Sequence, residues 1–163
     1  MGAAAGDVAQ AGSPVTFTSI GVVRSPQDRM SQGGWAGIES HIELDPRWVG
    51  GLEGLAAFSH VIVVFLLDRA RFDPAEHLTR QPRGRADAPR LGVFAQRTKY
   101  RPNPVAVTTV KLLRVDGNRV HVRGLDALDG TPVLDLKPYI PMFDRVEDPV
   151  VPPWVDAIMD GYF

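Results

Sequence analysis

The run VIVVFLL at residues 61–67 is the longest uninterrupted apolar stretch in the chain. A strand built from it is apolar on both faces, which is typical of a strand at the centre of a sheet. The run is far shorter than the ~18 apolar residues that a membrane-spanning helix needs. It therefore predicts a central β-strand, and no membrane partner is expected.

Shorter strand patterns surround this run. Residues 39–44 alternate polar and apolar side chains, and Asp116-Gly117-Asn118 is a typical hairpin turn between two strand patterns. No alternation of β and α segments is present, which predicts a mainly β fold: a small, mostly antiparallel β-barrel or strongly curved sheet with long loops. The expected strands lie at residues 15–23, 39–44, 61–67, 91–95, 105–115, 119–125 and 131–139. A short C-terminal helix is expected at residues 150–162, with Pro152 and Pro153 in its first turn.

The length of 163 residues and the hydrophobic content of 44% are those of a single globular domain. We expect that domain at residues 15–163, preceded by an Ala/Gly-rich disordered tail at residues 1–14. The chain has no cysteine, which excludes disulfides, thiolate zinc sites and a cysteine nucleophile, and fits a reducing cytoplasm. The four histidines lie far apart without ligand spacing, so no metal site is expected.

Positive charge is concentrated in one stretch although the net charge is only −1. Nine arginine and lysine residues lie between Arg69 and Arg101, opposed only by Asp73, Glu76 and Asp87. Arg97, Lys99 and Arg101 are spaced by two, so in an extended segment they would project from one face as a row of cations. A stiff Pro-Asn-Pro segment follows at residues 102–104. The row predicts an anionic partner, and the alternatives are a solvated basic loop or a surface turn with a salt-bridged arginine.

A second polar region runs from Asp126 to Tyr139. Asp135 and Lys137 share one face of the expected strand, where charges need partners. The segment Asp129-Gly130-Thr131-Pro132 offers free backbone groups around a glycine, which suits a small polar ligand. A plain hairpin turn is the alternative interpretation.

Four segments in order resemble the TsaA-like (TrmO) family, namely residues 20–26, 55–60, 92–104 and 125–139. The resemblance implies an S-adenosylmethionine-dependent methyltransferase that uses a small β-barrel and acts as a homodimer. The best-known members methylate N6 of N6-threonylcarbamoyladenosine beside the tRNA anticodon. Bacterial members carry an extra C-terminal domain, and we expect a short form without it.

The resemblance also implies where S-adenosylmethionine binds. One contact is the loop with Arg29, Met30, Ser31 and Gln32. Another is the pair Leu67 and Asp68, where family members often have an aromatic residue and a histidine. The last comprises Arg97 and the turn Asp129, Gly130, Thr131 and Pro132. Ala106 is a further departure, since the family usually has glycine there.

Roles in the reaction follow from the chemistry of methyl transfer. The acceptor nitrogen is part of a urea-like group and must lose a proton, so a base would help. The unranked candidates, chosen by proximity in sequence, are Asp126, Asp129, Asp135 and Tyr139. We expect substrate phosphate or carboxylate to be held by Lys99, Arg101 and Asn103, with Arg97 beside them. The alternatives are a methyltransferase for a small acidic metabolite and a non-catalytic S-adenosylmethionine-binding or RNA-binding module.

Overall fold

Strand β3 (His60–Leu66) is the central strand expected from the apolar run, in a computed structural model that describes residues 12–29, 31 and 33–163. Val61, Val63 and Phe65 point inward and are at most 1% exposed. The alternate residues of β3 are half-buried on the outer face. Most of the expected tail, residues 1–11, lies outside the described residues.

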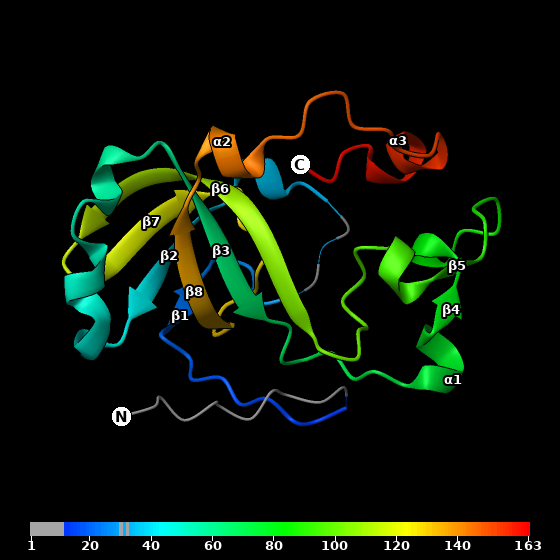
Figure 1. The fold of residues 1–163 in the computed structure, drawn as a ribbon, viewed down its shortest axis with the longest axis horizontal. Helices are drawn as coiled ribbons and strands as arrows, with labels where there is room; N and C mark the ends of the chain where they lie inside the picture. Colours follow the sequence, from blue (N-terminus) through cyan, green and yellow to red (C-terminus); the bar gives the residue numbers. More distant parts are fainter. Residues whose placement is uncertain (1–11, 30, 32) are drawn as a thin grey trace, which may run out of the picture.

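Six strands close into an antiparallel barrel in the order β1-β2-β7-β6-β3-β8, because β8 pairs with both β3 and β1 (Figure 1). Closure leaves these strands without the unpaired edges of an open sheet. The predicted mainly β, barrel-type fold is confirmed. The other barrel strands are β1 (Gly21–Arg24), β2 (Glu39–Leu44), β6 (Val105–Asp116), β7 (Arg119–Arg123) and β8 (Pro132–Pro138).

Alternating inward side chains fill the barrel. The fully buried valines of β1, β3, β6, β7 and β8 pack with Ile42 and Phe65. The expected hairpin joins β6 to β7 through Gly117, whose φ of +56° suits glycine. Short 3₁₀ helices cover the loops, namely η1 (Trp35–Gly37), η2 (Pro46–Leu52) and η3 (Leu55–Ala57).

Residues 68–104 form an arm that stands beside the barrel (Figure 1). Its centre is a stack of the His77 and Tyr100 rings, 4.2 Å apart between centroids. The strand expected at residues 91–95 was predicted too long, because Val93 turns into a 3₁₀ helix after two paired residues. The elements of the arm are α1 (Pro74–His77), β4 (Thr79–Arg80), η4 (Pro82–Gly84), β5 (Leu91–Gly92) and η5 (Val93–Ala95).

The C-terminal segment bridges the arm and the barrel. It contains α2 (Pro141–Asp144) and α3 (Trp154–Met159). Arg85 of the arm donates to the Ala157 carbonyl. Helix α3 is shorter than expected, because it begins only after Pro152 and Pro153 and ends before Asp160.

The strand expected at 15–23 begins only at Gly21, because its partner β2 ends at Leu44 where a proline turn follows.

Candidate functional site

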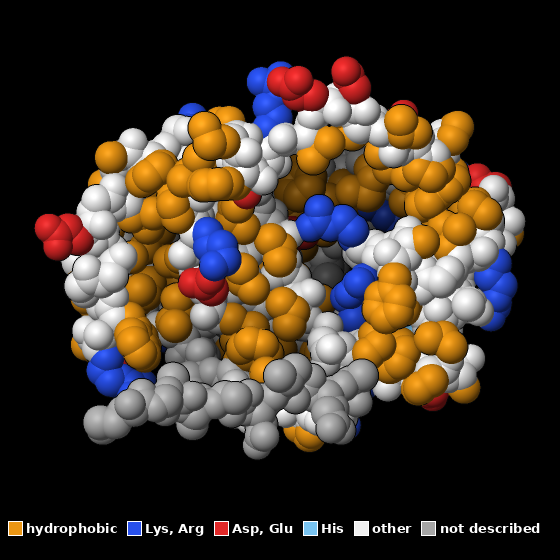
Figure 2. Space-filling view, in the orientation of Figure 1, with side chains coloured by type: hydrophobic (Ala, Val, Ile, Leu, Met, Phe, Trp, Pro, Cys, Tyr) orange, Lys and Arg blue, Asp and Glu red, His pale blue; other side chains and the backbone are white. Residues whose placement is uncertain are grey.

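A small cavity at the end of β3 brings together residues from distant parts of the sequence. Its volume is about 40 Å³. The walls come from the loop after β3, the arm and the turn before β8, and they include Leu67, Asp68, Arg69, Lys99, Asp126 and Thr131. Figure 2 shows a hollow between the barrel and the arm with Lys or Arg side chains on its rim. The predicted base candidate Asp126 thus shares one cavity with four other predicted site residues, namely Leu67, Asp68, Lys99 and Thr131.

Arg69 joins two loops of the site. Its Nη1 donates to the Asp28 carbonyl at 3.2 Å, and its Nη2 donates to the Asp129 carbonyl at 2.6 Å. One planar guanidinium therefore ties the loop after β1 to the turn before β8. The sequence pattern did not distinguish Arg69 from the other eight cations between residues 69 and 101. Its place directly after the end of the central strand was the available signal.

The turn that begins at Asp129 is fixed by its own hydrogen bonds. The Asp129 carboxylate accepts from the Ser25 backbone N–H at 3.1 Å, and the Asp129 N–H donates to the Gln27 carbonyl at 2.8 Å. Gly130, with a φ of +80°, donates to the Val23 carbonyl. The Asp129 carboxylate thus holds the loop after β1, and the turn is preorganised before any ligand arrives.

Asp126 is held by two hydroxyl groups. Thr108 Oγ1 donates to its Oδ1 at 2.6 Å, and the Tyr162 hydroxyl donates to its Oδ2 at 2.7 Å. Each carboxylate oxygen has a second lone pair with which it can accept a proton or a further hydrogen bond. Asp126 is therefore oriented toward the cavity with acceptor capacity left.

Tyr162 is a site residue that the sequence did not reveal. Burial, reinforced by the hydrogen bond to Asp126, raises the pKa of its hydroxyl above the ordinary value of 10.0. The hydroxyl therefore remains a donor at physiological pH. Tyr162 is placed by two backbone bonds of its segment, from Gly34 N–H to the Gly161 carbonyl at 3.0 Å and from Trp35 N–H to the Tyr162 carbonyl at 3.2 Å.

The three cations expected in one row do not share a face. Arg97 donates to the Val107 carbonyl of β6, and Arg101 donates to the carbonyls of Val93 and Gln96. The segment that holds them has no regular strand structure, so the period of two that predicts a common face does not apply. Lys99 alone of the three lines the cavity. Asn103 is exposed, and its carbonyl accepts from Val105 N–H.

Asp135 and Tyr139 lie apart from the cavity in this chain. Asp135 forms an ion pair with Lys137 at 2.6 Å on the outer face of β8. Tyr139 follows the far end of β8, where its ring lies 6.3 Å from the His60 ring. The geometry therefore favours Asp126 among the four base candidates, with Asp129 committed to the loop.

The loop after β1 carries the remaining predicted cofactor contacts. Arg29 is exposed, and Ser31 Oγ donates to the Gly33 carbonyl at 2.6 Å. Met30 and Gln32 lie outside the described residues. Pro132 is the first residue of β8, a position where the ladder tolerates a missing N–H.

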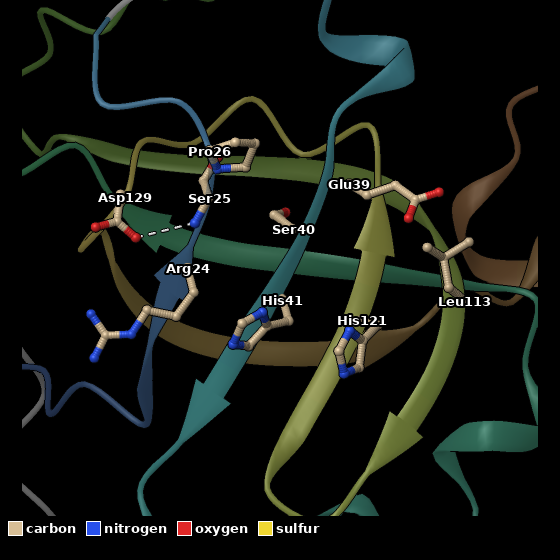
Figure 3. Close-up of a pocket in the computed structure, with 9 residues that line it drawn as sticks. All are labelled: Arg24, Ser25, Pro26, Glu39, Ser40, His41, Leu113, His121 and Asp129. Atoms are coloured by element: carbon tan, nitrogen blue, oxygen red, sulfur yellow. Dashed lines mark hydrogen bonds between the residues drawn. The ribbon is translucent and has the colours of Figure 1, made fainter.

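A larger depression of about 340 Å³ lies on the outer face of the barrel. Figure 3 shows His41 and His121 side by side on β2 and β7, with Arg24 on one flank. Their ring centroids are 5.2 Å apart. Burial lowers the pKa of both rings. The positive charge of Arg119 lowers the pKa of His41 further, and that of Arg114 lowers the pKa of His121 further. No predicted site residue except Asp129 lines this depression.

The described residues form neither a metal site nor a membrane-spanning helix. Among the described residues, no group of three or more His, Cys, Asp or Glu side chains is arranged to hold a metal ion. In the same part of the chain, no helix has the length and apolar character that crossing a membrane requires.

Comparison with known families gives a match that spans the arm and all of the barrel strands except most of β1. Residues 24–145 match the family described as the tRNA-methyltransferase O N-terminal domain. A protein of Methanothermobacter thermautotrophicus called a probable S-adenosyl-L-methionine-binding protein is 42% identical over 136 residues, which are 81% of this chain and 95% of the relative. An Archaeoglobus fulgidus protein with the same description is 41% identical over 136 residues, 81% of this chain and 36% of the relative.

Two further matches are a tRNA methyltransferase and a solved structure of TrmO. The tRNA (adenine(37)-N6)-methyltransferase of Escherichia coli is 33% identical over 147 residues, which cover 83% of this chain and 62% of the relative. The crystal structure of TrmO from Pseudomonas aeruginosa superposes with a TM-score of 0.71 at 32% identity, covering 87% of this chain and 62% of that one. The chain thus spans less than two thirds of both of these proteins.

Proposed function

Because the chain belongs to the TrmO family of the tRNA-methyltransferase O N-terminal domain, we propose that it is an S-adenosylmethionine-dependent tRNA methyltransferase. The acceptor is N6 of the adenosine at position 37, the position that the Escherichia coli relative is named for. The family resemblance implies that this adenosine, next to the anticodon, carries the N6-threonylcarbamoyl group. The observation that carries the proposal is the family match over residues 24–145, which includes strands β2 to β8, the arm and every residue that lines the cavity.

The cavity offers the chemistry that S-adenosylmethionine requires. The Asp68 carboxylate is exposed at the cavity and suits the ammonium of the cofactor, and Leu67 and Leu128 give an apolar wall for the adenine. The turn from Asp129 to Pro132 forms one side of the site, and Arg69 holds it in place through the Asp129 carbonyl. The enclosed volume of about 40 Å³ takes one part of the cofactor, and the rest occupies the open side. When bound, the cofactor supplies an electrophilic methyl group on a sulfonium.

The chain contributes orientation and a proton acceptor. Holding two reactants in line can lower a barrier by ~7–11 kcal/mol without any covalent intermediate on the protein. Asp126 is the base that accepts the proton of the acceptor nitrogen, with Thr108 and Tyr162 holding its two oxygens. Lys99 lies at the same cavity and binds phosphate or the threonyl carboxylate of the substrate.

The enzyme acts as a homodimer in the cytoplasm, where tRNA is modified. Support for the dimer comes from apolar side chains that the described chain leaves uncovered. Val107 on β6 is 44% exposed and pairs with the half-buried Val64 on the outer face of β3. Phe94 and Phe143 are 79% and 77% exposed. Light scattering should give twice the chain mass of 17.8 kDa, and a mass of one chain at micromolar concentration would overturn the dimer.

The experiment that tests the function is incubation with methyl-labelled S-adenosylmethionine and total tRNA. Label in tRNA supports the proposal. Label in a small acidic metabolite from a cell extract, with none in tRNA, would favour a metabolite methyltransferase. Cofactor binding without any transfer would favour a non-catalytic binding module.

A further inference from the structure

The arm carries charge of one sign. Between residues 69 and 101 there are nine cationic side chains and three carboxylates, a formal charge of +6, whereas the rest of the chain carries −7. The whole-chain charge of −1 conceals this separation. A patch of one sign attracts a polyanion and raises its rate of encounter.

The cations of the arm have few carboxylate partners. On the barrel, Arg24, Arg123 and Lys137 each form an ion pair. On the arm, within the described residues, the one arginine in an ion pair is Arg85, which pairs with Asp87. A hydrogen bond to a carbonyl or contact with an aromatic ring orients a cation but leaves its charge uncompensated. The arm therefore holds oriented positive charge that an anionic ligand can neutralise.

The positions of these cations form a path away from the cavity. Lys99 lines the cavity and also lies over the Tyr100 ring, 5.1 Å from its centroid. Arg80 lies over the same ring at 5.4 Å. Arg80 belongs to β4, and Arg90, beside β5, donates through Nε to Thr79 of β4. The path thus runs from the cavity across Tyr100 to the β4–β5 pair.

The composition of the path indicates the class of ligand. Arginine outnumbers lysine by eight to one between residues 69 and 101. The guanidinium fork matches phosphate oxygens, and its weak hydration favours such contacts. The Tyr100 ring is stacked on His77 and lies under Arg80 and Lys99, so it orients the cations and is not offered to a base. The surface therefore suits a phosphate backbone.

We propose that the arm, through the path of Lys99, Arg80 and Arg90 and through the exposed Arg71, binds the phosphodiester backbone of an RNA strand that leads the target nucleotide into the cavity. This inference rests on the proposed function and adds the surface that grips the substrate. Arg71 and Arg90 are exposed, and Arg71 has no ion-pair partner among the described residues. Both contact phosphate and not bases, so binding depends little on the sequence of the flanking nucleotides.

The test uses the full chain and an anticodon stem-loop RNA in a fluorescence anisotropy titration over a range of salt concentrations. Arg71→Gln and Arg90→Gln are combined in one variant, since neither residue contacts the cavity. Arg47→Gln, which breaks the exposed pair with Asp45 on the barrel, is the matched control. Losing two phosphate contacts should flatten the slope of log affinity against log salt by about 1.4–1.8 and raise the Kd for RNA by about tenfold or more.

The control variant should have the wild-type Kd for RNA and the wild-type salt slope. Cofactor affinity measured by calorimetry should be equal in all three proteins. The inference is overturned if the double variant keeps the wild-type slope and Kd while the wild type methylates tRNA, a result that leaves the proposed function intact. It is also overturned if the double variant changes the oligomeric state and not RNA affinity, because the arm would then contact the acidic surface of a second copy. A wild type that transfers no methyl group to any tRNA refutes the proposed function instead.

Discussion

The Tyr162 hydroxyl donates a 2.7 Å hydrogen bond to Oδ2 of Asp126, 36 residues earlier in the chain. Thr108 of β6 donates to the other oxygen of the same carboxylate. A single aspartate therefore joins the barrel, the turn before β8 and the C-terminal segment. The orientation of the candidate base depends on a residue that lies outside the family match.

Tyr162→Phe should lower the free energy of unfolding by about 1–3 kcal/mol, because it removes a hydrogen bond to a carboxylate and keeps the ring. Urea denaturation at pH 8 measures the loss. Turnover should fall more than cofactor affinity, since Asp126 loses one of its two orienting contacts. Unchanged stability and turnover would show that the hydrogen bond contributes nothing in solution.

The same pair predicts a pH dependence. The pKa of Tyr162 is raised in the folded state above its unfolded value of 10.0, so its contribution to stability is complete below pH 10 and declines as the pH rises above it. The stability difference between the wild type and Tyr162→Phe should therefore shrink in alkali. Denaturation of both proteins at pH 8 and pH 11 tests this, and a difference that stays constant would contradict it.

Arg69→Lys should weaken S-adenosylmethionine binding about tenfold or more, because one ammonium cannot reach the Asp28 and Asp129 carbonyls that two guanidinium nitrogens now bind. Calorimetry gives the Kd. Arg47→Lys on the barrel surface controls for the general effect of the exchange and should bind as the wild type does. Equal affinity in all three proteins would remove Arg69 from the site.

Gly33→Ala should detach the C-terminal segment from the loop after β1. A Cβ at Gly33 would lie 2.1 Å from the Gly161 carbonyl oxygen, far inside contact distance. Hydrogen exchange should become faster at the Gly34 and Trp35 amides, and the Tm should fall. Gly37→Ala is the matched control, since a Cβ there meets nothing within 4 Å. If both variants behave alike, the close approach does not exist in solution.

The histidine pair on the barrel predicts a loss of stability in acid. Burial depresses the pKa of His41 and of His121 below the unfolded value of 6.5, so the neutral pair stabilises the fold above that pH. Protonation of the unfolded chain then lowers stability as the pH falls below 6.5, and the facing Arg24, Arg114 and Arg119 oppose protonation of the folded chain. In urea denaturation, the free energy of unfolding of His121→Gln should decline less steeply between pH 7 and pH 5 than that of the wild type. Parallel declines in the two proteins would argue against a role for the pair.

Much of the barrel could be predicted from local patterns. The apolar run at 61–67 forms the predicted central strand, because Val61, Val63 and Phe65 pack inward on the core and β3 is paired on both sides, with β6 and β8. The turn at Asp116-Gly117-Asn118 appears where expected because glycine there adopts a positive φ. These features depend on neighbours in the sequence, which a pattern can detect.

The site could be predicted only in part, because its contacts are long-range. The three cations do not form the predicted row, because Arg97 and Arg101 lie in an irregular segment and donate to backbone carbonyls. Asp135 and Tyr139 lie close to Asp126 in sequence, but β8 carries them along the barrel away from the cavity. Arg69 and Tyr162 gained their roles from partners 60 and 36 residues away, which no spacing rule encodes.

The central claim is methyl transfer to N6 of the modified adenosine at position 37. The most direct measurement is mass spectrometry of nucleosides from tRNA that was incubated with the protein and S-adenosylmethionine, with tRNA lacking the threonylcarbamoyl group as a parallel substrate. We predict one additional methyl group on N6-threonylcarbamoyladenosine in the first tRNA and no methylated adenosine in the second. A protein that binds the cofactor yet leaves both nucleoside profiles unchanged would contradict the account.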